Sequence, residues 1–238
     1  EHLQSFINEH QYGKYANHPS LKAADYKLAV KTSNGRGVYT FCMCPGGKVI
    51  NSSSEAGGIV VNGMSNQARD EANANSAVLV TVGPEDFASS HPLAGITYQR
   101  ELEQKAFELG GKDYSVPVMR VEDYLNDTLD LKMEEVSCSV QPNVRYAKLS
   151  QIFSNEVNLA LKEGLQLMNH KFTGFTEKAM LSGVESRSSA PVRLYRDENF
   201  QSNIKGIMPI GEGAGYAGGI MSSAIDGLKC SEFILKGE

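Results

Sequence analysis

The stretch Gly206-Ile-Met-Pro-Ile-Gly-Glu-Gly-Ala-Gly-Tyr-Ala-Gly-Gly219 decides how the end of this 238-residue chain is expected to fold. An apolar run over 204–210 leads directly into five closely spaced glycines, and apolar residues at helical spacing follow at once. This order predicts a strand over 204–210, a glycine turn, and a helix over 218–235.

The turn contains the spacing G-x-G-x-x-G at Gly213, Gly215 and Gly218, which is the dinucleotide-binding fingerprint. In a Rossmann unit a second strand follows, and it ends in an acidic residue about 20 positions further on. Residues 219–238 leave no room for that strand, so the ordinary Rossmann interpretation is not expected to apply.

The chemistry of such a turn does not depend on the full Rossmann unit. Glycines let the backbone approach a ligand closely, and the start of a helix offers unpaired N–H groups with a partial positive charge. Glu212 adds an acceptor that suits a sugar or ribityl hydroxyl. The alternative is that the glycines serve only the close packing of strand and helix.

Upstream of the turn, the sequence is rich in strands first and in helices later. Pro45-Gly46-Gly47 separates two β-prone runs and predicts a hairpin. The whole pattern predicts an α+β fold that closes with the strand–turn–helix unit. The expected strands are 26–30, 37–44, 48–53, 58–62, 76–82, 179–185 and 191–196, and the expected helices are 3–12, 91–110, 121–125 and 154–168.

Composition excludes several classes of protein. The chain has 23 Lys and Arg against 28 Asp and Glu, a net charge of −5, which disfavours general nucleic-acid binding. Four cysteines are too few for a disulfide scaffold, and no apolar run reaches the roughly 18 residues of a membrane span. A cytoplasmic protein without nucleic-acid or membrane partners is expected.

Three further stretches, together with 211–227, resemble one family. They are the segment 35–47, the segment 60–75 with Asn62-Gly63-Met64-Ser65, Arg69-Asp70 and Asn73-Ala-Asn75, and the segment 183–193. In this order they are similar to uncharacterised bacterial FAD-dependent dehydrogenases, flavoproteins with a Rossmann FAD domain and an inserted substrate domain. The resemblance covers residues 23–238.

The resemblance implies that this chain is the C-terminal part of a longer flavoprotein, whose N-terminal half carries the pyrophosphate-binding fingerprint. It implies an N-terminal segment over 1–22, an inserted β-rich substrate domain over 23–178, and over 179–238 the last portion of an α/β FAD/NAD(P)-binding domain. The implied FAD contacts are Gly211, Glu212, Gly213, Ala214, Gly215, Tyr216, Gly218, Gly219 and Ile220.

The resemblance also places Arg187 and Ser189 near the flavin or substrate, and these two residues are the candidates for a catalytic role. A guanidinium could hold an anionic substrate or the reduced flavin. Glu185 lies two residues before Arg187, so a surface salt bridge between them is the other interpretation.

Cys42 and Cys44 lie on an expected strand, where alternation would put both thiols on one face. Cys138 and Cys230 are isolated, so the four ligands of a structural zinc site are missing, and we expect reduced cysteines without metal. Buried apolar thiols are one interpretation, and a thiol at the flavin or substrate is the other.

Two functions are therefore expected from the sequence. The first is an FAD-dependent oxidoreductase, inactive in the isolated C-terminal part, that acts on a small-molecule substrate. The alternative is a protein whose inserted domain binds a partner macromolecule. No histidine pair or G-x-S-x-G motif indicates a metalloenzyme or a hydrolase.

Overall fold

The computed structural model describes residues 1–130 and 138–237. The chain divides into two compact units, each built from two separate stretches of sequence. Unit 1 comprises Glu1–Val82 and Glu101–Glu185, and unit 2 comprises Gly83–Arg100 and Ser186–Glu238. The boundaries expected at residues 22 and 178 concern the domains of a longer protein, and they stay a prediction.

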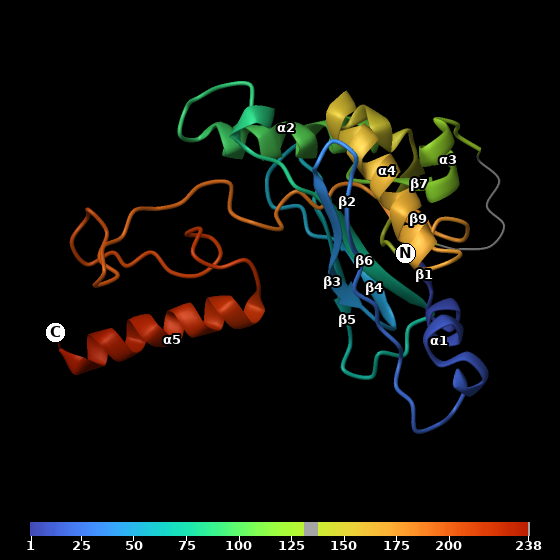
Figure 1. The fold of residues 1–238 in the computed structure, drawn as a ribbon. Coiled ribbons are helices and arrows are strands. Elements are labelled where there is room, and N and C mark those ends of the chain that lie inside the picture. The colour runs from blue at the N-terminus through green and yellow to red at the C-terminus, as the bar shows by residue number, and fades with distance from the viewer. Residues whose placement is uncertain (131–137, 238) are drawn as a thin grey trace. The chain divides into compact units, whose positions relative to one another are not determined.

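Unit 1 holds all of the strands that the structure describes (Figure 1). They are β1 (His2–Leu3), β2 (Ala29–Lys31), β3 (Gly37–Cys44), β4 (Gly47–Asn51), β5 (Val61–Ser65), β6 (Asn73–Val80), β7 (Val116–Arg120), β8 (Val144–Tyr146) and β9 (Met180–Ser182). The helices of unit 1 are α1 (Gln4–Tyr12), α3 (Val121–Asn126) and α4 (Asn155–Lys171), with short 3-10 turns at Gly13–Tyr15 and Leu149–Gln151.

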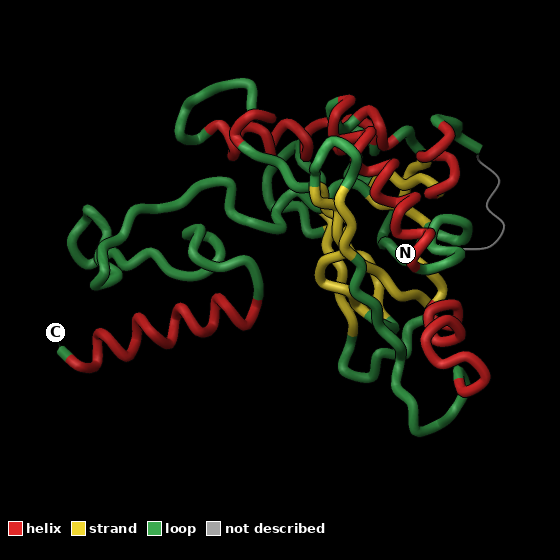
Figure 2. The backbone as a smooth tube through the Cα atoms, in the orientation of Figure 1, coloured by secondary structure: helices red, strands yellow, loops and turns green. Residues whose placement is uncertain are grey.

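Unit 2 contains α5 (Ile220–Lys236) and a 3-10 turn at Pro84–Asp86. Helix α2 (Ala94–Leu109) begins in unit 2 and ends in unit 1. The remainder of unit 2 is loop and turn, drawn green in Figure 2.

The strands of unit 1 form three sheets. An antiparallel sheet has the order β1-β6-β3-β2, β4 and β5 make an antiparallel pair, and β7 lies between the parallel β8 and the antiparallel β9. Helix α4 packs on β2, β3 and β6, and its buried face meets a core that includes Val38 and Ala74. These mixed sheets and helices confirm the predicted α+β class.

The hairpin predicted around Pro45-Gly46-Gly47 is wrong, because β3 pairs with β2 and β6 whereas β4 pairs with β5. The register of β3 on β6 shifts between Phe41 and Cys44, where β3 has one residue more than β6, and Cys42 has φ +45°. Such a bulge bends a strand and increases its twist, so the chain turns away from β3 into a second sheet. The bulge also breaks the alternation that predicted one shared face for Cys42 and Cys44.

The strands predicted over 191–196 and 204–210 are also wrong, since neither stretch forms a ladder within the described residues. The carbonyl groups of the second stretch are taken by other donors. Gln201 Nε2 donates to the carbonyls of Ile204 and Ile207, at 2.7 and 2.9 Å, and Arg196 Nη1 donates to that of Pro209 at 2.9 Å. Pro209 itself has no N–H to offer a neighbouring strand. The helix predicted over 218–235 is confirmed as α5.

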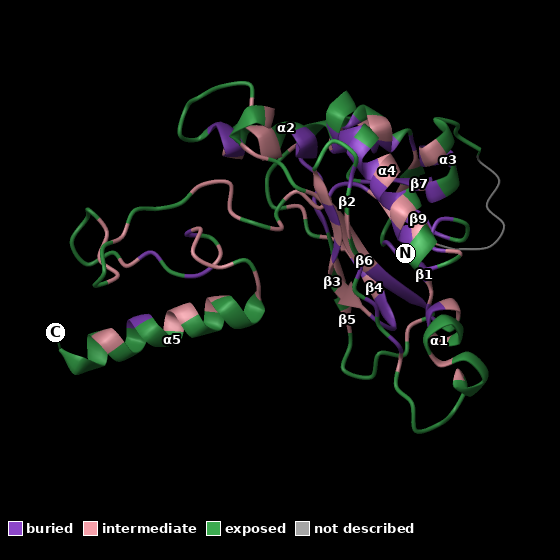
Figure 3. Ribbon diagram, in the orientation of Figure 1, coloured by how far each residue is buried: buried purple, intermediate pink, exposed green. Residues whose placement is uncertain are grey.

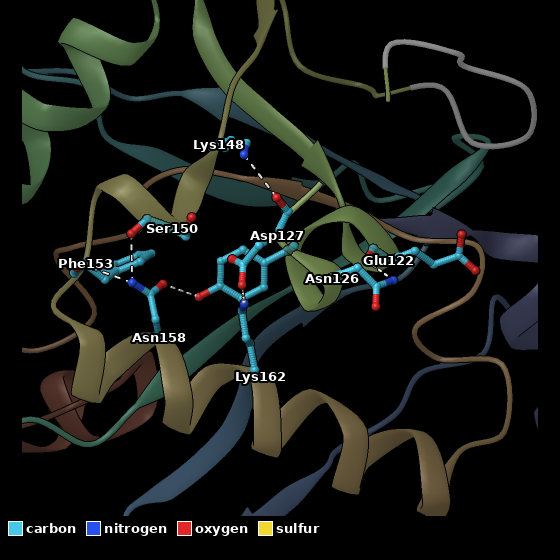
Figure 4. A network of polar contacts seen from close by, with 9 residues as sticks. Glu122, Asn126, Asp127, Lys148, Ser150, Phe153, Asn158 and Lys162 are labelled. Atoms are coloured by element: carbon cyan, nitrogen blue, oxygen red, sulfur yellow. Dashed lines mark hydrogen bonds and ion pairs between the residues drawn. The ribbon is translucent and has the colours of Figure 1, made fainter. Parts of the chain in front are cut away.

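Helix α4 begins as the sequence predicts, because the Ser154 side chain accepts a hydrogen bond from the Val157 N–H at 3.3 Å. A polar network then joins α3 to α4 (Figure 4). Tyr124 Oη donates to Asn158 Oδ1 at 2.7 Å, and Asn158 Nδ2 donates to the carbonyls of Ser150 and Phe153 at 2.8 and 3.2 Å. Every polar atom of the Asn158 amide is therefore used, and the network holds the two helices together without any ligand.

Gly164 sets how closely α4 approaches the sheet. A Cβ at this position would lie 2.6 Å from Cβ and Cγ1 of Val38 on β3. We expect Gly164→Ala to lower the free energy of unfolding of unit 1 by about 2 kcal/mol, because overpacking outweighs the gain in helix propensity. Chemical denaturation followed by circular dichroism measures this change.

Gly227 in α5 is the matched control, because among the described atoms the Cβ of an alanine there would meet only Ile210 Cδ1, at 3.9 Å. Gly227→Ala should leave stability unchanged or raise it by up to about 1 kcal/mol. Equal effects of the two substitutions would contradict the packing argument.

Candidate functional site

The glycine turn lies in unit 2, between the loop over 204–210 and α5. Gly211 and Gly215 have φ values of +72° and +82°, in the left-handed region that favours glycine. A Cβ on Gly215 would also lie 2.5 Å from the Val192 carbonyl oxygen. These two glycines are therefore required by the fold of the turn itself.

Gly213 and Gly218 are different. A Cβ built on either of them meets no described atom within 4 Å, and neither residue has a positive φ. Both residues are exposed. Nothing within unit 2 thus requires glycine at these positions, and the packing interpretation does not account for them.

Helix α5 starts directly after the turn, and its N-terminus is uncapped by any side chain because Gly219 stands at the cap position. The first N–H groups of a helix have no partner inside the helix. Among the described residues, the buried Oγ of Ser223 in the first turn of α5 also has no hydrogen-bond partner. This helix end therefore presents backbone N–H groups that a ligand could bind, whereas the Ser223 hydroxyl is covered by the chain itself.

An ion pair between Arg196 and Asp226 fixes the turn. Arg196 donates from Nη1 to Asp226 Oδ2 and from Nη2 to Asp226 Oδ1, both at 2.8 Å, and both side chains are largely covered. The same carboxylate accepts the Gly211 N–H at 2.8 Å. The hydrogen bonds from Arg196 lower the pKa of Asp226 to about 2, so this carboxylate is ionised over the whole neutral range.

Tyr216 is held at the centre of the turn. The Arg196 guanidinium lies 3.6 Å from the centroid of its ring and that of Arg193 lies 4.3 Å from it. The phenol donates a hydrogen bond to the Leu194 carbonyl at 2.9 Å, and the Leu194 N–H donates to the Ala214 carbonyl at 3.1 Å. The turn is thus pinned to residues 193–196 by stacking and by hydrogen bonds.

The other residues expected at the site have definite places. Ala214 is buried in the turn, Glu212 is half-buried, and Ile220 is 85% exposed at the start of α5. Arg187 and Ser189 lie exposed on a separate loop of unit 2. Gln99 on α2 anchors that loop by donating from Nε2 to the carbonyls of Ser186 and Ser189, at 2.8 and 3.2 Å.

The Arg196–Asp226 pair is not predicted by the sequence. The two residues lie 30 positions apart on opposite sides of the glycines, and no local spacing rule connects them. The only signal was the occurrence of an isolated acidic residue in an otherwise apolar stretch of α5.

In the part of the chain that the structure describes, no group of three His, Cys, Asp or Glu side chains could hold a metal ion. None of the helices described is long and apolar enough to cross a membrane.

Comparison with known proteins identifies the family of this chain. A sequence model of the family described as "FAD-dependent protein, C-terminal domain-like" matches residues 1–188, which include unit 1 and end before Ser189 and the glycine turn. An uncharacterized protein of Clostridium beijerinckii (strain ATCC 51743 / NCIMB 8052) is 48% identical over 239 residues, which cover 99% of this chain. The chain spans 45% of the length of that relative. It belongs to the FAD-dependent protein, C-terminal domain-like family.

Proposed function

We propose that this chain is the C-terminal part of an FAD-dependent oxidoreductase, and that the turn over 211–220 contacts FAD in the whole protein. The open space at Gly213 and Gly218 is the observation that carries the proposal. Glycine is needed there only if something outside the described residues approaches the backbone closely.

The polar groups around the turn fit this cofactor. The N–H groups at the start of α5 would face carbonyl or phosphate oxygens of FAD, which are acceptors. The Glu212 carboxylate would accept a hydrogen bond from a ribityl or ribose hydroxyl. FAD, when bound, supplies the electron transfer, and the protein supplies position, charge and exclusion of water.

The rest of α5 also supports a role inside a larger FAD domain. Figure 3 shows the helix largely exposed, and its exposed side chains include Met221 at 72%, Leu228 at 63% and Leu235 at 86%. Apolar residues in such number are typical of a surface that another part of a protein covers. In the proposed oxidoreductase the remaining portion of the FAD domain covers this face.

Arg187 and Ser189 are proposed to bind the small-molecule substrate or the flavin. A guanidinium on an exposed loop can pair with an anionic group, and a hydroxyl can donate to the same group. Their exposed positions on the loop held by Gln99 support this role.

The full-length protein provides the test. We expect it to purify yellow with about one FAD per chain, to bleach with dithionite, and to recover its absorbance when an electron acceptor is added. A full-length protein that is colourless, and that cannot be reconstituted with added FAD, would contradict the proposal. It would favour the alternative in which the inserted domain binds a partner macromolecule.

A further inference from the structure

Arg193 lies directly against the glycine turn, and both belong to unit 2. A Cβ on Gly215 would lie 2.9 Å from the Arg193 Cα and 3.2 Å from its Cβ. The next residue along the chain, Leu194, donates its N–H to the Ala214 carbonyl at 3.1 Å. The side chain of Arg193 therefore starts at the backbone of the turn, and two separate contacts fix where it starts.

The guanidinium of Arg193 is held over the ring of Tyr216, at 4.3 Å from the ring centroid. The ring is itself fixed, because its hydroxyl donates to the Leu194 carbonyl at 2.9 Å and the Arg196 guanidinium lies 3.6 Å from its centroid. Stacking on an aromatic ring restricts a long side chain and leaves the N–H donors at the edge of the guanidinium available. The donors of Arg193 are thus arranged before any ligand binds.

No carboxylate in the described part of the chain pairs with Arg193. Arg196, over the same ring, is neutralised by Asp226. The Asp197 carboxylate accepts backbone N–H groups of its own loop, at 2.9 Å each, and Glu212 in the turn makes no ion pair with Arg193. Two guanidiniums and one carboxylate at the ring therefore leave a positive charge that is not compensated.

We infer that Arg193 binds a negatively charged oxygen of FAD in the whole protein. The inference rests on the proposed function, because it takes the turn beside Arg193 as a surface that FAD contacts. FAD offers such oxygens on its pyrophosphate, which is charged in both oxidation states, and on its ring system, which gains charge on reduction. An arginine fork can donate to either of them.

The features of the turn agree on the sign of the ligand's charge. An arginine at 193 brings a second cation to a ring that already carries Arg196, and like charges at such distances repel one another. An anion bound by Arg193 removes this repulsion. The N–H groups at the start of α5, which follows the same turn, also favour an anion. A neutral or cationic ligand would leave the charge of Arg193 uncompensated.

Full-length protein carrying Arg193→Gln tests the inference through two measurements, the dissociation constant of oxidised FAD and the flavin midpoint potential. Loss of a charge-assisted hydrogen bond is expected to weaken binding about tenfold. If Arg193 binds the pyrophosphate, this dissociation constant rises about tenfold and the potential stays unchanged. If Arg193 binds the ring system, whose oxidised form is neutral, the dissociation constant stays unchanged and the potential falls by about 30 mV, the two-electron equivalent of a tenfold change.

Lys205→Gln is the matched control, because it removes the same charge from an exposed position of unit 2 outside the turn. It should leave both measurements at their wild-type values. Arg193→Lys retains the charge without the fork and should lie between wild type and Arg193→Gln. Circular dichroism verifies folding, and Arg193→Met, which keeps an apolar stem against Tyr216, is used if the glutamine variant does not fold.

The wild-type protein separates failure of this inference from failure of the proposed function. If wild-type protein binds FAD, and Arg193→Gln changes neither measurement or changes them only as much as Lys205→Gln does, the inference is overturned and the proposed function stands. If wild-type protein binds no FAD, both are contradicted.

Discussion

Full-length protein carrying Gly218→Val is expected to purify folded but without flavin. A Cβ at this position would meet no described atom within 4 Å, so the described part of unit 2 leaves room for a side chain to begin there. In the proposed complex, the branched side chain stands between the backbone and FAD and displaces the N–H groups at the start of α5. A loss of about 3 kcal/mol of binding free energy lowers FAD affinity more than a hundredfold, enough to empty the purified protein.

Absorbance at the flavin maximum gives FAD per chain, and circular dichroism verifies folding. Ser231→Val is the control, since it adds a branched side chain to an exposed polar position of the same helix, away from the glycine turn. It should retain the wild-type flavin content. A folded Gly218→Val protein with normal FAD would show that the turn does not approach the cofactor.

The second large effect is expected at the ion pair. Asp226→Ala removes both hydrogen bonds from Arg196 and the acceptor of the Gly211 N–H. The guanidinium is then left largely covered and without its counter-charge, which costs about 3 kcal/mol. Hydrogen exchange of the amides in 210–219 should accelerate by about two orders of magnitude.

Glu198→Ala is the control for this substitution, because Glu198 is an exposed carboxylate two residues beyond Arg196. Its effect on exchange should be negligible. An unchanged exchange rate in Asp226→Ala would mean that the stacking on Tyr216 holds the turn without the pair.

The same pair makes unit 2 sensitive to acid. The pKa of Asp226 falls from an ordinary value of 3.8 to about 2 in the folded protein. The stabilisation from this group is fully present above about pH 4 and is lost as the pH falls through about 2. Asp226→Ala should therefore reduce the difference between pH 5 and pH 2.5 in the protection of the turn amides, measured relative to their intrinsic exchange rates.

Local sequence signals predicted the helices of this chain better than they predicted which strands pair with one another. Ser154 as a cap and the apolar periodicity after it were sufficient to predict α4, and the glycines followed by an amphipathic run were sufficient to predict α5. The partner of β4 depends on the bulge at Cys42 and on the close approach of Gly46 to Arg69. Neither feature has a local spacing that the sequence displays.

In the candidate site, too, the sequence reveals the local motif but not the contacts between distant residues. The glycines of the turn are visible in the sequence, but only the structure separates Gly211 and Gly215, which the backbone requires, from Gly213 and Gly218, which it does not. Cys44 and Asn75 lie on different strands, and their pairing follows from the register of β3 on β6 rather than from any motif. The strand predicted over 204–210 failed because side-chain donors, which propensity does not describe, occupy its carbonyls.

Each unit is built from two separate stretches of the sequence, and this affects how the chain folds during synthesis on the ribosome. Strands β1 to β6 emerge before α4, which packs on β2, β3 and β6 and begins more than 70 residues after β6 ends. The hydrogen bond from the Ser33 backbone to Glu163, 130 positions apart, illustrates how distant these contacts are along the chain. Contacts of such sequence separation form slowly. Until α4 is synthesised, the apolar face of the sheet on which it packs is uncovered. A translational pause before α4 would prolong this exposure and favour chaperone binding or aggregation.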